Sequence, residues 1–97
     1  MSIVRARGSP FQCGSDIVFL PEMPFKNELT IRVESGGTFK VYIKTIQNPG
    51  EEVSSTNADY FLDSGDSITF KRDKIKDISQ VHFLTITGDP LIFWDHI

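Results

Sequence analysis

Apolar and polar residues alternate along much of this chain, which is typical of β-strands that bury one face. Residues 28–34 (ELTIRVE) place Leu, Ile and Val on one side and Thr and Arg on the other, and residues 38–46 (TFKVYIKTI) repeat the alternation. Residues 35–37 (SGG) lie between these segments, and glycine supplies the positive φ that tight connections need. The pattern therefore predicts a β-hairpin over residues 28–46.

Four further segments have the same strand character. They are residues 15–20 (SDIVFL), 67–72 (SITFKR), 80–87 (QVHFLTIT) and 91–97 (LIFWDHI). The last two flank a TGDP turn at residues 87–90 and predict a second hairpin. Residues 74–79 (KIKDIS) predict a brief strand or a single helical turn, and residues 48–60 predict the longest loop, of a length that is usually mobile or functional.

About six to eight short strands at this spacing predict an all-β fold, either a small antiparallel β-sandwich or a jelly-roll-like barrel. The chain of 97 residues is expected to form one domain. Residues 1–14 lack alternation after Ile3 and Val4, so we expect an extended N-terminal arm outside a single sandwich domain of residues 15–97. The side chains expected to point into the core are Leu29, Ile31, Val33, Phe39, Val41, Ile43, Ile68, Phe70, Leu84 and Ile86.

The formal charge of −3 is unevenly distributed. Residues 1–14 contain Arg5 and Arg7 and no acid, so the other 83 residues hold eight of the 10 basic side chains and all 13 acidic ones, a balance of −5. An acidic body argues against a nucleic-acid partner, which selects for a basic face. The basic run KRDKIK at residues 71–76 fits a solvated strand edge better than a phosphate-binding patch.

Cys13 is the single cysteine of the chain, which excludes an intramolecular disulfide framework and fits a reducing compartment. The sequence has neither a charged-then-apolar leader nor an apolar run near the ~20 residues that span a membrane. We therefore expect a protein assembled in the cytoplasm, with no membrane partner.

Residues 60–70 (YFLDSGDSITF) gather aspartates and serines around Gly65 and are the stretch most similar to a chemical site. A serine nucleophile needs a histidine base, but neither His82 nor His96 lies in a nucleophile-elbow context. The aspartates match no EF-hand loop, and two His and one Cys form no recognisable ligand set for a transition metal. We expect no catalytic, metal or cofactor site, and a tight corner between two strands with Gly65 in the left-handed conformation.

The C-terminal pattern, DSGDSITF followed by KIKDI and VHFLTITGDPLIFW, resembles the small β-sandwich virion proteins of tailed bacteriophages. The resemblance covers residues 60–97 and is carried by a strand corner, an I-x-x-I segment and a last hairpin. These features are Leu62, Gly65, Asp66, Ser67, Ile75, Ile78 and the turn around Gly88. The resemblance implies a capsid decoration or cement protein, localised to the virion, whose partner is the major capsid protein or another virion protein.

A short acidic all-β chain without a catalytic constellation is suited to binding another surface, and we expect a non-enzymatic protein. In the N-terminal arm, Arg5 and Arg7 offer charge and Phe11 an apolar anchor for a partner. Aromatic residues outside the core also need covering, and Phe93 and Trp94 occupy opposite faces of their strand. The residues expected to bind partners are Arg5, Arg7, Phe11, Tyr42, Phe93 and Trp94.

The small core and the strand edges favour a homo-oligomer, and the resemblance favours a trimer because capsid lattices have local three-fold positions. The alternative is a free-standing binding module for a carbohydrate or protein ligand, such as part of a fibre or receptor-binding assembly. A small enzyme of the cupin type is the third class, and it requires clustered histidines and carboxylates that the sequence lacks.

Overall fold

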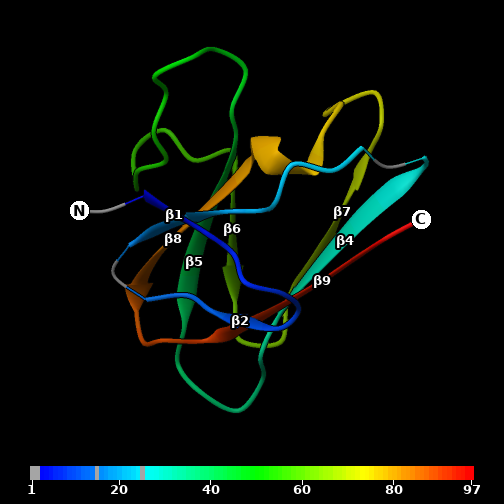
Figure 1. Cartoon of the computed structure of the whole chain (residues 1–97). Helices are drawn as coiled ribbons and strands as arrows, with labels where there is room; N and C mark the ends of the chain where they lie inside the picture. Colours follow the sequence, from blue (N-terminus) through cyan, green and yellow to red (C-terminus); the bar gives the residue numbers. More distant parts are fainter. Residues whose placement is uncertain (1–2, 15, 25) are drawn as a thin grey trace.

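The computed structural model describes residues 3–14, 16–24 and 26–97, which form two β-sheets packed face to face (Figure 1). The five-stranded sheet has the order β1-β3-β8-β5-β6, and the four-stranded sheet has the order β2-β9-β4-β7. The strands are β1 (Ile3–Arg5), β2 (Phe11–Gln12), β3 (Ile17–Phe19), β4 (Glu28–Val33), β5 (Lys40–Thr45), β6 (Tyr60–Asp63), β7 (Ser67–Lys71), β8 (Val81–Thr87) and β9 (Leu91–His96), with a 3₁₀ turn, η1 (Ile78–Gln80), before β8. The all-β sandwich that the sequence predicts is confirmed.

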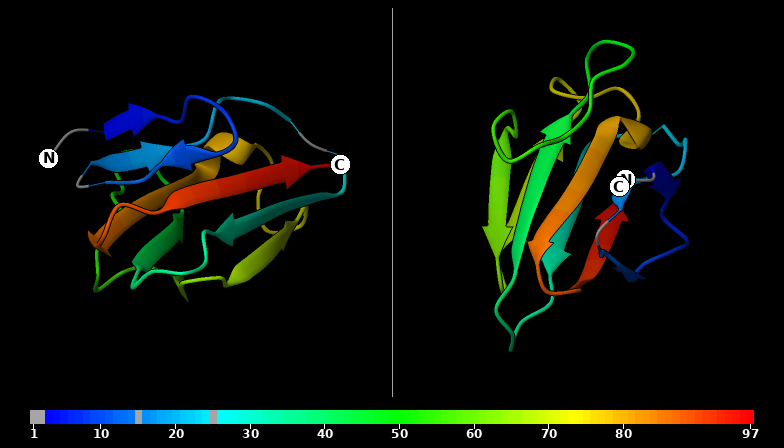
Figure 2. Two further views of the ribbon diagram at one scale, coloured as in Figure 1. Left: turned by 90° about the horizontal axis from the view of Figure 1, so that it is seen from below. Right: turned by 90° about the vertical axis from the view of Figure 1, so that its left-hand side faces the viewer.

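Strands β2 to β9 follow a jelly-roll course, in which the chain crosses between two sheets at almost every connection. Among the described strands, only β5 and β6 are consecutive and also paired with each other. β1 extends the five-stranded sheet by pairing parallel to β3. Figure 2 shows the two layers, with the connections β4–β5, β6–β7 and β8–β9 at the same end of the molecule.

Both predicted hairpins are wrong in their pairing, although their strands exist. β4 pairs with β7 and β9, whereas β5 pairs with β6 and β8, so residues 34–39 bridge the two sheets. The connection between β8 and β9 bridges them in the same way. Alternation and a glycine-containing turn are common to a hairpin and to a crossing between sheets, because both keep the apolar side chains inward. The alternation of apolar and polar residues therefore does not determine which sheet the next strand joins.

Glu34 ties the connections at this end of the sandwich together. Its backbone oxygen accepts hydrogen bonds from Gly65 N at 3.1 Å and from Ser64 Oγ at 3.3 Å, and its Oε1 accepts one from Leu91 N at 3.0 Å. The residue after β4 thus contacts both the corner between β6 and β7 and the first residue of β9, and it fixes the three connections relative to one another.

Phe39 fills the space beside these connections. Its partly buried ring packs on the main core, and a Cβ added at Gly88 would lie 2.7 Å from a ring carbon and 3.1 Å from the Thr38 carbonyl oxygen. Gly88 also has φ of 79°, a conformation that side-chain-bearing residues rarely adopt. Both the backbone and the available space therefore require glycine at this position.

We predict that Gly88→Ala lowers the free energy of unfolding by about 2–3 kcal/mol, because left-handed strain adds to overpacking against Phe39. Gly50→Ala is the matched control, since Gly50 has φ of 87° and an added Cβ meets nothing within 4 Å. Its expected loss is about 1 kcal/mol, from strain alone. Urea unfolding followed by far-UV circular dichroism compares the two variants. Equal losses would contradict the packing of Phe39 on Gly88.

The main core lies between the sheets and follows the predicted alternation of β4 and β5. All five of their inward side chains, together with Phe70 of β7, are buried, and Phe39 and Ile68 are partly buried against them. The five are Leu29, Ile31, Val33, Val41 and Ile43.

The predicted inward positions on β8 are wrong. Val81 and Phe83 point into the main core and are fully buried, whereas Leu84 is buried in a separate cluster on the outer face and Ile86 is 56% exposed. β8 (VHFLTIT) carries apolar residues at both odd and even positions, so its alternation does not determine which set faces inward.

The structure does not confirm the extended arm predicted for residues 1–14, of which residues 1–2 lie outside the described part of the chain. β1 pairs with β3 and β2 pairs with β9, and Ala6, Phe11 and Cys13 are buried in the main core. The Phe11 and Phe83 rings meet edge to face with their centroids 5.4 Å apart. The glycine, serine and proline at residues 8–10 lie between two short edge strands, where they interrupt no ladder. Residues 3–14 are therefore integral to both sheets.

A helical turn, the second of the two predicted alternatives, begins within residues 74–79, since η1 runs from Ile78 to Gln80. The Asp77 carboxylate accepts hydrogen bonds from Ser79 N at 2.9 Å and Met23 N at 3.0 Å, which caps η1 and ties it to the segment before β4. Ile75 and Ile78 are buried in the main core beneath this cap.

Candidate functional site

The outer face of the five-stranded sheet carries apolar side chains across all its strands. Residues directly opposite on neighbouring strands share a face, and the strand registers place one apolar residue of each strand in a line. We call this line the apolar row. Read across β6, β5, β8, β3 and β1, it consists of Phe61, Tyr42, Leu84, Ile17 and Ile3. The outer face of a sandwich is normally polar. An apolar row on this face therefore indicates that another part of the chain, or a partner, covers it.

The connection between β5 and β6, residues 46–59, covers the middle of the apolar row. Val53 of this loop is only 3% exposed and clusters with Ile17 and Leu84, and Tyr42 and Ala58 pack against the cluster. The longest predicted loop is therefore anchored by a small second core on the outside of the sheet.

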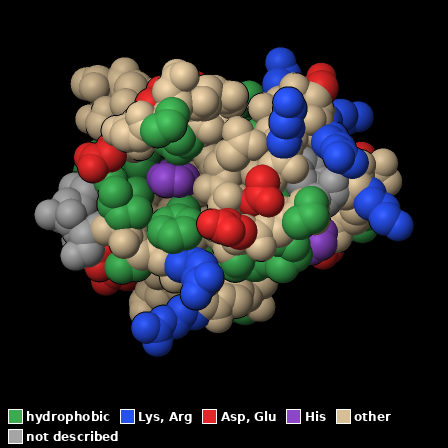
Figure 3. Space-filling view, turned by 45° about the horizontal axis from the view of Figure 1, so that its top comes forward, with side chains coloured by type: hydrophobic (Ala, Val, Ile, Leu, Met, Phe, Trp, Pro, Cys, Tyr) green, Lys and Arg blue, Asp and Glu red, His purple; other side chains and the backbone are tan. Residues whose placement is uncertain are grey.

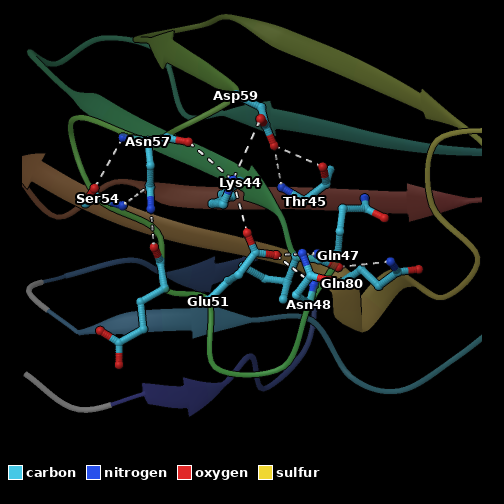
Figure 4. A network of polar contacts seen from close by, with 11 residues as sticks. Lys44, Thr45, Gln47, Asn48, Glu51, Ser54, Asn57, Asp59 and Gln80 are labelled. Carbon is cyan, nitrogen blue, oxygen red and sulfur yellow. Dashed lines mark hydrogen bonds and ion pairs between the residues drawn. The ribbon is translucent and has the colours of Figure 1, made fainter.

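Polar contacts also hold this loop on β5 (Figure 4). Lys44 Nζ lies 3.8 Å from a Glu51 carboxylate oxygen and 4.0 Å from an Asp59 carboxylate oxygen. Glu51 accepts hydrogen bonds from Asn48 N at 2.7 Å and Gln47 N at 2.8 Å, and these two N–H groups hold the pKa of its carboxyl below the usual 4.5. The ionised carboxylate is thus part of the loop structure.

The two ends of the apolar row remain uncovered. Phe61 on the edge strand β6 is 55% exposed, and its ring centroid lies 6.2 Å from that of Tyr42. On the opposite edge strand, β1, Ile3 is 46% exposed and Val4 is 40% exposed. Figure 3 shows hydrophobic side chains gathered around a histidine on one side of the molecule, while several Lys and Arg side chains gather on the other side. Both edges of the five-stranded sheet therefore present apolar surface to solvent.

His82 lies on β8 beside the apolar row. Its ring stacks on Phe19 with the centroids 5.6 Å apart, and its cross-strand neighbour is Lys44. Nδ1 is buried and has no hydrogen-bond partner among the described residues. Burial lowers the pKa of His82 below the ordinary 6.5, and the Ser79 backbone opposes this effect.

We predict that the burial of His82 lowers the free energy of unfolding in mild acid. The unfolded chain protonates His82 near pH 6.5 and the folded protein only at lower pH, so the free energy of unfolding falls as the pH drops below about 6.5 and levels off below the folded-state pKa. The slope contributed by His82 is below about 1.4 kcal/mol per pH unit. Urea midpoints between pH 5 and 7.5 should vary less for His82→Gln than for the wild type. His96→Gln is the control for removing a histidine elsewhere, and an unchanged pH dependence in His82→Gln would contradict the prediction.

The structure places the six residues predicted to bind partners in three parts of the molecule. Arg5 and Arg7 are exposed on β1 and just after it, and they line one hollow of about 330 Å³ together with Phe11, whose ring is otherwise buried in the core. Tyr42 is half-buried within the apolar row. Tyr42 therefore lies apart from the other three residues, which border the same hollow.

Phe93 and Trp94 face opposite sides of β9, as the alternation predicts. Trp94 packs against the main core, and its Nε1 donates a hydrogen bond to the Gly8 carbonyl oxygen at 2.8 Å. The Phe93 ring lies on the outer side of the four-stranded sheet, with the Arg32 guanidinium carbon 4.3 Å from its centroid.

Residues 60–70 form a corner, now seen to run from β6 in one sheet to β7 in the other. Gly65 has φ of 80°, and the Asp66 carboxylate accepts a hydrogen bond from Asp63 N at 2.9 Å. Across the described ranges of the chain, no group of three or more His, Cys, Asp or Glu side chains is placed to hold a metal ion.

Cys13 is a structural thiol. It is fully buried and accepts a hydrogen bond from Thr85 Oγ1 at 2.7 Å, and burial raises its pKa to about 11. The thiol is therefore protonated at neutral pH and is a poor nucleophile.

Sequence reasoning missed Phe61, Ile3 and the covering residue Val53. One signal was present, because Tyr60, Phe61 and Leu62 are three successive apolar residues, as are Ile17, Val18 and Phe19. Strands of this kind are apolar on both faces and need a cover on each.

The comparisons with known proteins return no relative, since the chain matches no family model, no curated protein and no solved structure. Of the helices in the described part of the chain, none is long and apolar enough to cross a membrane. The class defined here is a jelly-roll sandwich with an apolar row on the outer face of one sheet.

Proposed function

We propose that this chain is a non-enzymatic structural protein of a tailed-phage virion, of the capsid decoration or cement type. The observation that carries the proposal is the apolar row, whose two ends are exposed at opposite edges of one sheet. Exposed apolar surface on a small soluble domain is a feature of protein–protein contact sites. The resemblance of residues 60–97 to phage virion proteins supplies the kind of partner, the major capsid protein or another virion protein.

The fold adds support by analogy. Jelly-roll sandwiches recur in viral capsid domains, and also in lectins and cupins. Analogy at the level of the fold does not establish a function. It agrees with a virion role, and the thiol of Cys13 and the corner at residues 60–70 both have structural explanations.

The two exposed edges suit a ring of identical subunits, and we propose the homotrimer that the sequence favours. Phe61 lies at the β6 edge and Ile3 and Val4 at the β1 edge. A contact from the β6 edge of one copy to the β1 edge of the next is head-to-tail, and such contacts close into rings when the rotation permits. A trimer placed on a local three-fold position then presents three equivalent copies to the capsid lattice, and the three contacts reinforce one another.

Co-sedimentation tests the proposal. Purified protein is mixed at tens of micromolar with heads of the encoding phage from which the chain has been depleted, and the heads are pelleted. We expect the protein to pellet at a saturable ratio to the capsid protein, and the free protein to sediment as a trimer. A protein that remains in the supernatant at every concentration would contradict the virion role, and a free monomer would contradict the ring.

A further inference from the structure

A groove of about 480 Å³ lies along the outer side of the four-stranded sheet, away from the apolar row. β4 contributes Thr30 and Arg32 to its lining, β9 contributes Phe93 and Asp95, and β7 contributes Ser67. In the strand register, Arg32 lies between Phe93 and Ser67. The volume falls within the roughly 300–1,000 Å³ of sites that bind small molecules.

Arg32 is held in this groove by an aromatic contact. Its guanidinium carbon lies 4.3 Å from the Phe93 ring centroid, a cation–π arrangement that fixes the side chain. Within the described ranges, neither Arg32 nor Asp95 has an ion-pair partner within 4.0 Å. The Arg32 guanidinium and the Asp95 carboxylate are therefore not ion-paired with each other or with a neighbouring charge.

The polar groups of the groove fit a ligand that both donates and accepts hydrogen bonds. Arg32 only donates, ionised Asp95 only accepts, and the hydroxyls of Thr30 and Ser67 do both. The two formal charges cancel, which disfavours a phosphate or another strongly anionic ligand. The Phe93 side chain adds apolar surface to the lining, and Trp94, whose side chain packs against the main core, borders the groove.

We propose that this groove binds an uncharged saccharide. The rim of a sugar ring carries hydroxyls that donate and accept in alternation, and its C–H faces are apolar. The mixed lining of charged, hydroxyl and aromatic side chains matches both properties. The site is separate from the apolar row, so it is independent of head binding.

Trp94 provides the assay, because it is the single tryptophan of the chain and lies on β9 at the border of the groove. The full-length protein is titrated with glucose, galactose, mannose, lactose, maltose, cellobiose and chitobiose, and each titration is repeated with inorganic phosphate. We expect a saturable change in Trp94 fluorescence with at least one saccharide at millimolar or lower concentration, and no competition by phosphate.

Two variants connect the signal to the groove. Arg32→Met keeps an apolar stem over Phe93 without the donors, and Asp95→Asn removes the charged acceptor; each is expected to weaken binding at least tenfold. Arg72→Met, at an exposed arginine outside the groove, is the matched control and should bind as the wild type does. Circular dichroism confirms that each variant is folded.

Three outcomes would overturn the proposal. They are a flat response to every saccharide of the panel, competition by phosphate, and a response that survives unchanged in both groove variants. Arg32→Met should also pellet with phage heads as the wild type does. Loss of head binding in that variant would contradict the independence of the two surfaces.

Discussion

Phe11→Ala is expected to lower the free energy of unfolding by about 3–5 kcal/mol, a large part of the roughly 5–15 kcal/mol that stabilises a small domain. Phe11 is only 7% exposed, and its ring meets Phe83 between the two sheets. Removing the ring leaves a cavity between β2 and β8 that the surrounding strands cannot fill. Urea unfolding monitored by far-UV circular dichroism measures the loss.

The same substitution at Phe61 is the matched control, because Phe61 is 55% exposed on an edge strand. Phe61→Ala should cost less than about 1 kcal/mol. If the first 14 residues were a free arm that grips a partner, Phe11→Ala would fold with unchanged stability and fail only in binding. That result would contradict the placement of residues 3–14 within both sheets.

The second large effect is expected at the exposed end of the apolar row. Phe61→Asp should convert the proposed trimer to a monomer and weaken the proposed binding to phage heads at least a hundredfold, because an unpaired charge would be buried in each subunit contact. The fold should survive, since the side chain is more than half exposed and charged residues are common on edge strands. Sedimentation velocity and co-sedimentation with heads provide the two readings.

Ile97→Asp introduces the same charge at an apolar side chain that is 65% exposed and lies outside the apolar row. It should leave both the trimer and head binding unchanged. If Phe61→Asp remains trimeric and binds heads as the wild type does, the exposed ends of the row are not the subunit contact. If Ile97→Asp is equally defective, the effect of the charge is not specific to this surface.

The strands themselves were predictable because they rest on local alternation. Leu29, Ile31 and Val33 are buried as their spacing indicates, and Gly65 adopts the positive φ expected of a corner. Alternation does not show which strands pair with each other. The residues at 35–37 and 87–90 are compatible with a hairpin and with a crossing between sheets, and only the packing of all eight strands of the jelly roll decides between them.

The candidate site was less predictable for a related reason. Tyr42 was expected to bind partners because it is a surplus aromatic, and it lies in the apolar row, whereas Phe11 was expected to anchor an N-terminal arm and is buried in the core. A row that spans five strands depends on their order, and β1 and β6 are far apart in the sequence. The covering role of Val53 likewise appears only once the loop is seen folded back on the sheet.

The amount of this chain in purified virions tests the central claim most directly. The proposed function implies an encoding phage, whose particles are banded on a density gradient so that the chain and the major capsid protein can be quantified together by mass spectrometry. A virion structural protein is predicted to co-migrate with the particles at a constant ratio to the capsid protein across the band. A chain that is expressed during infection but stays in the particle-free fractions would contradict the account.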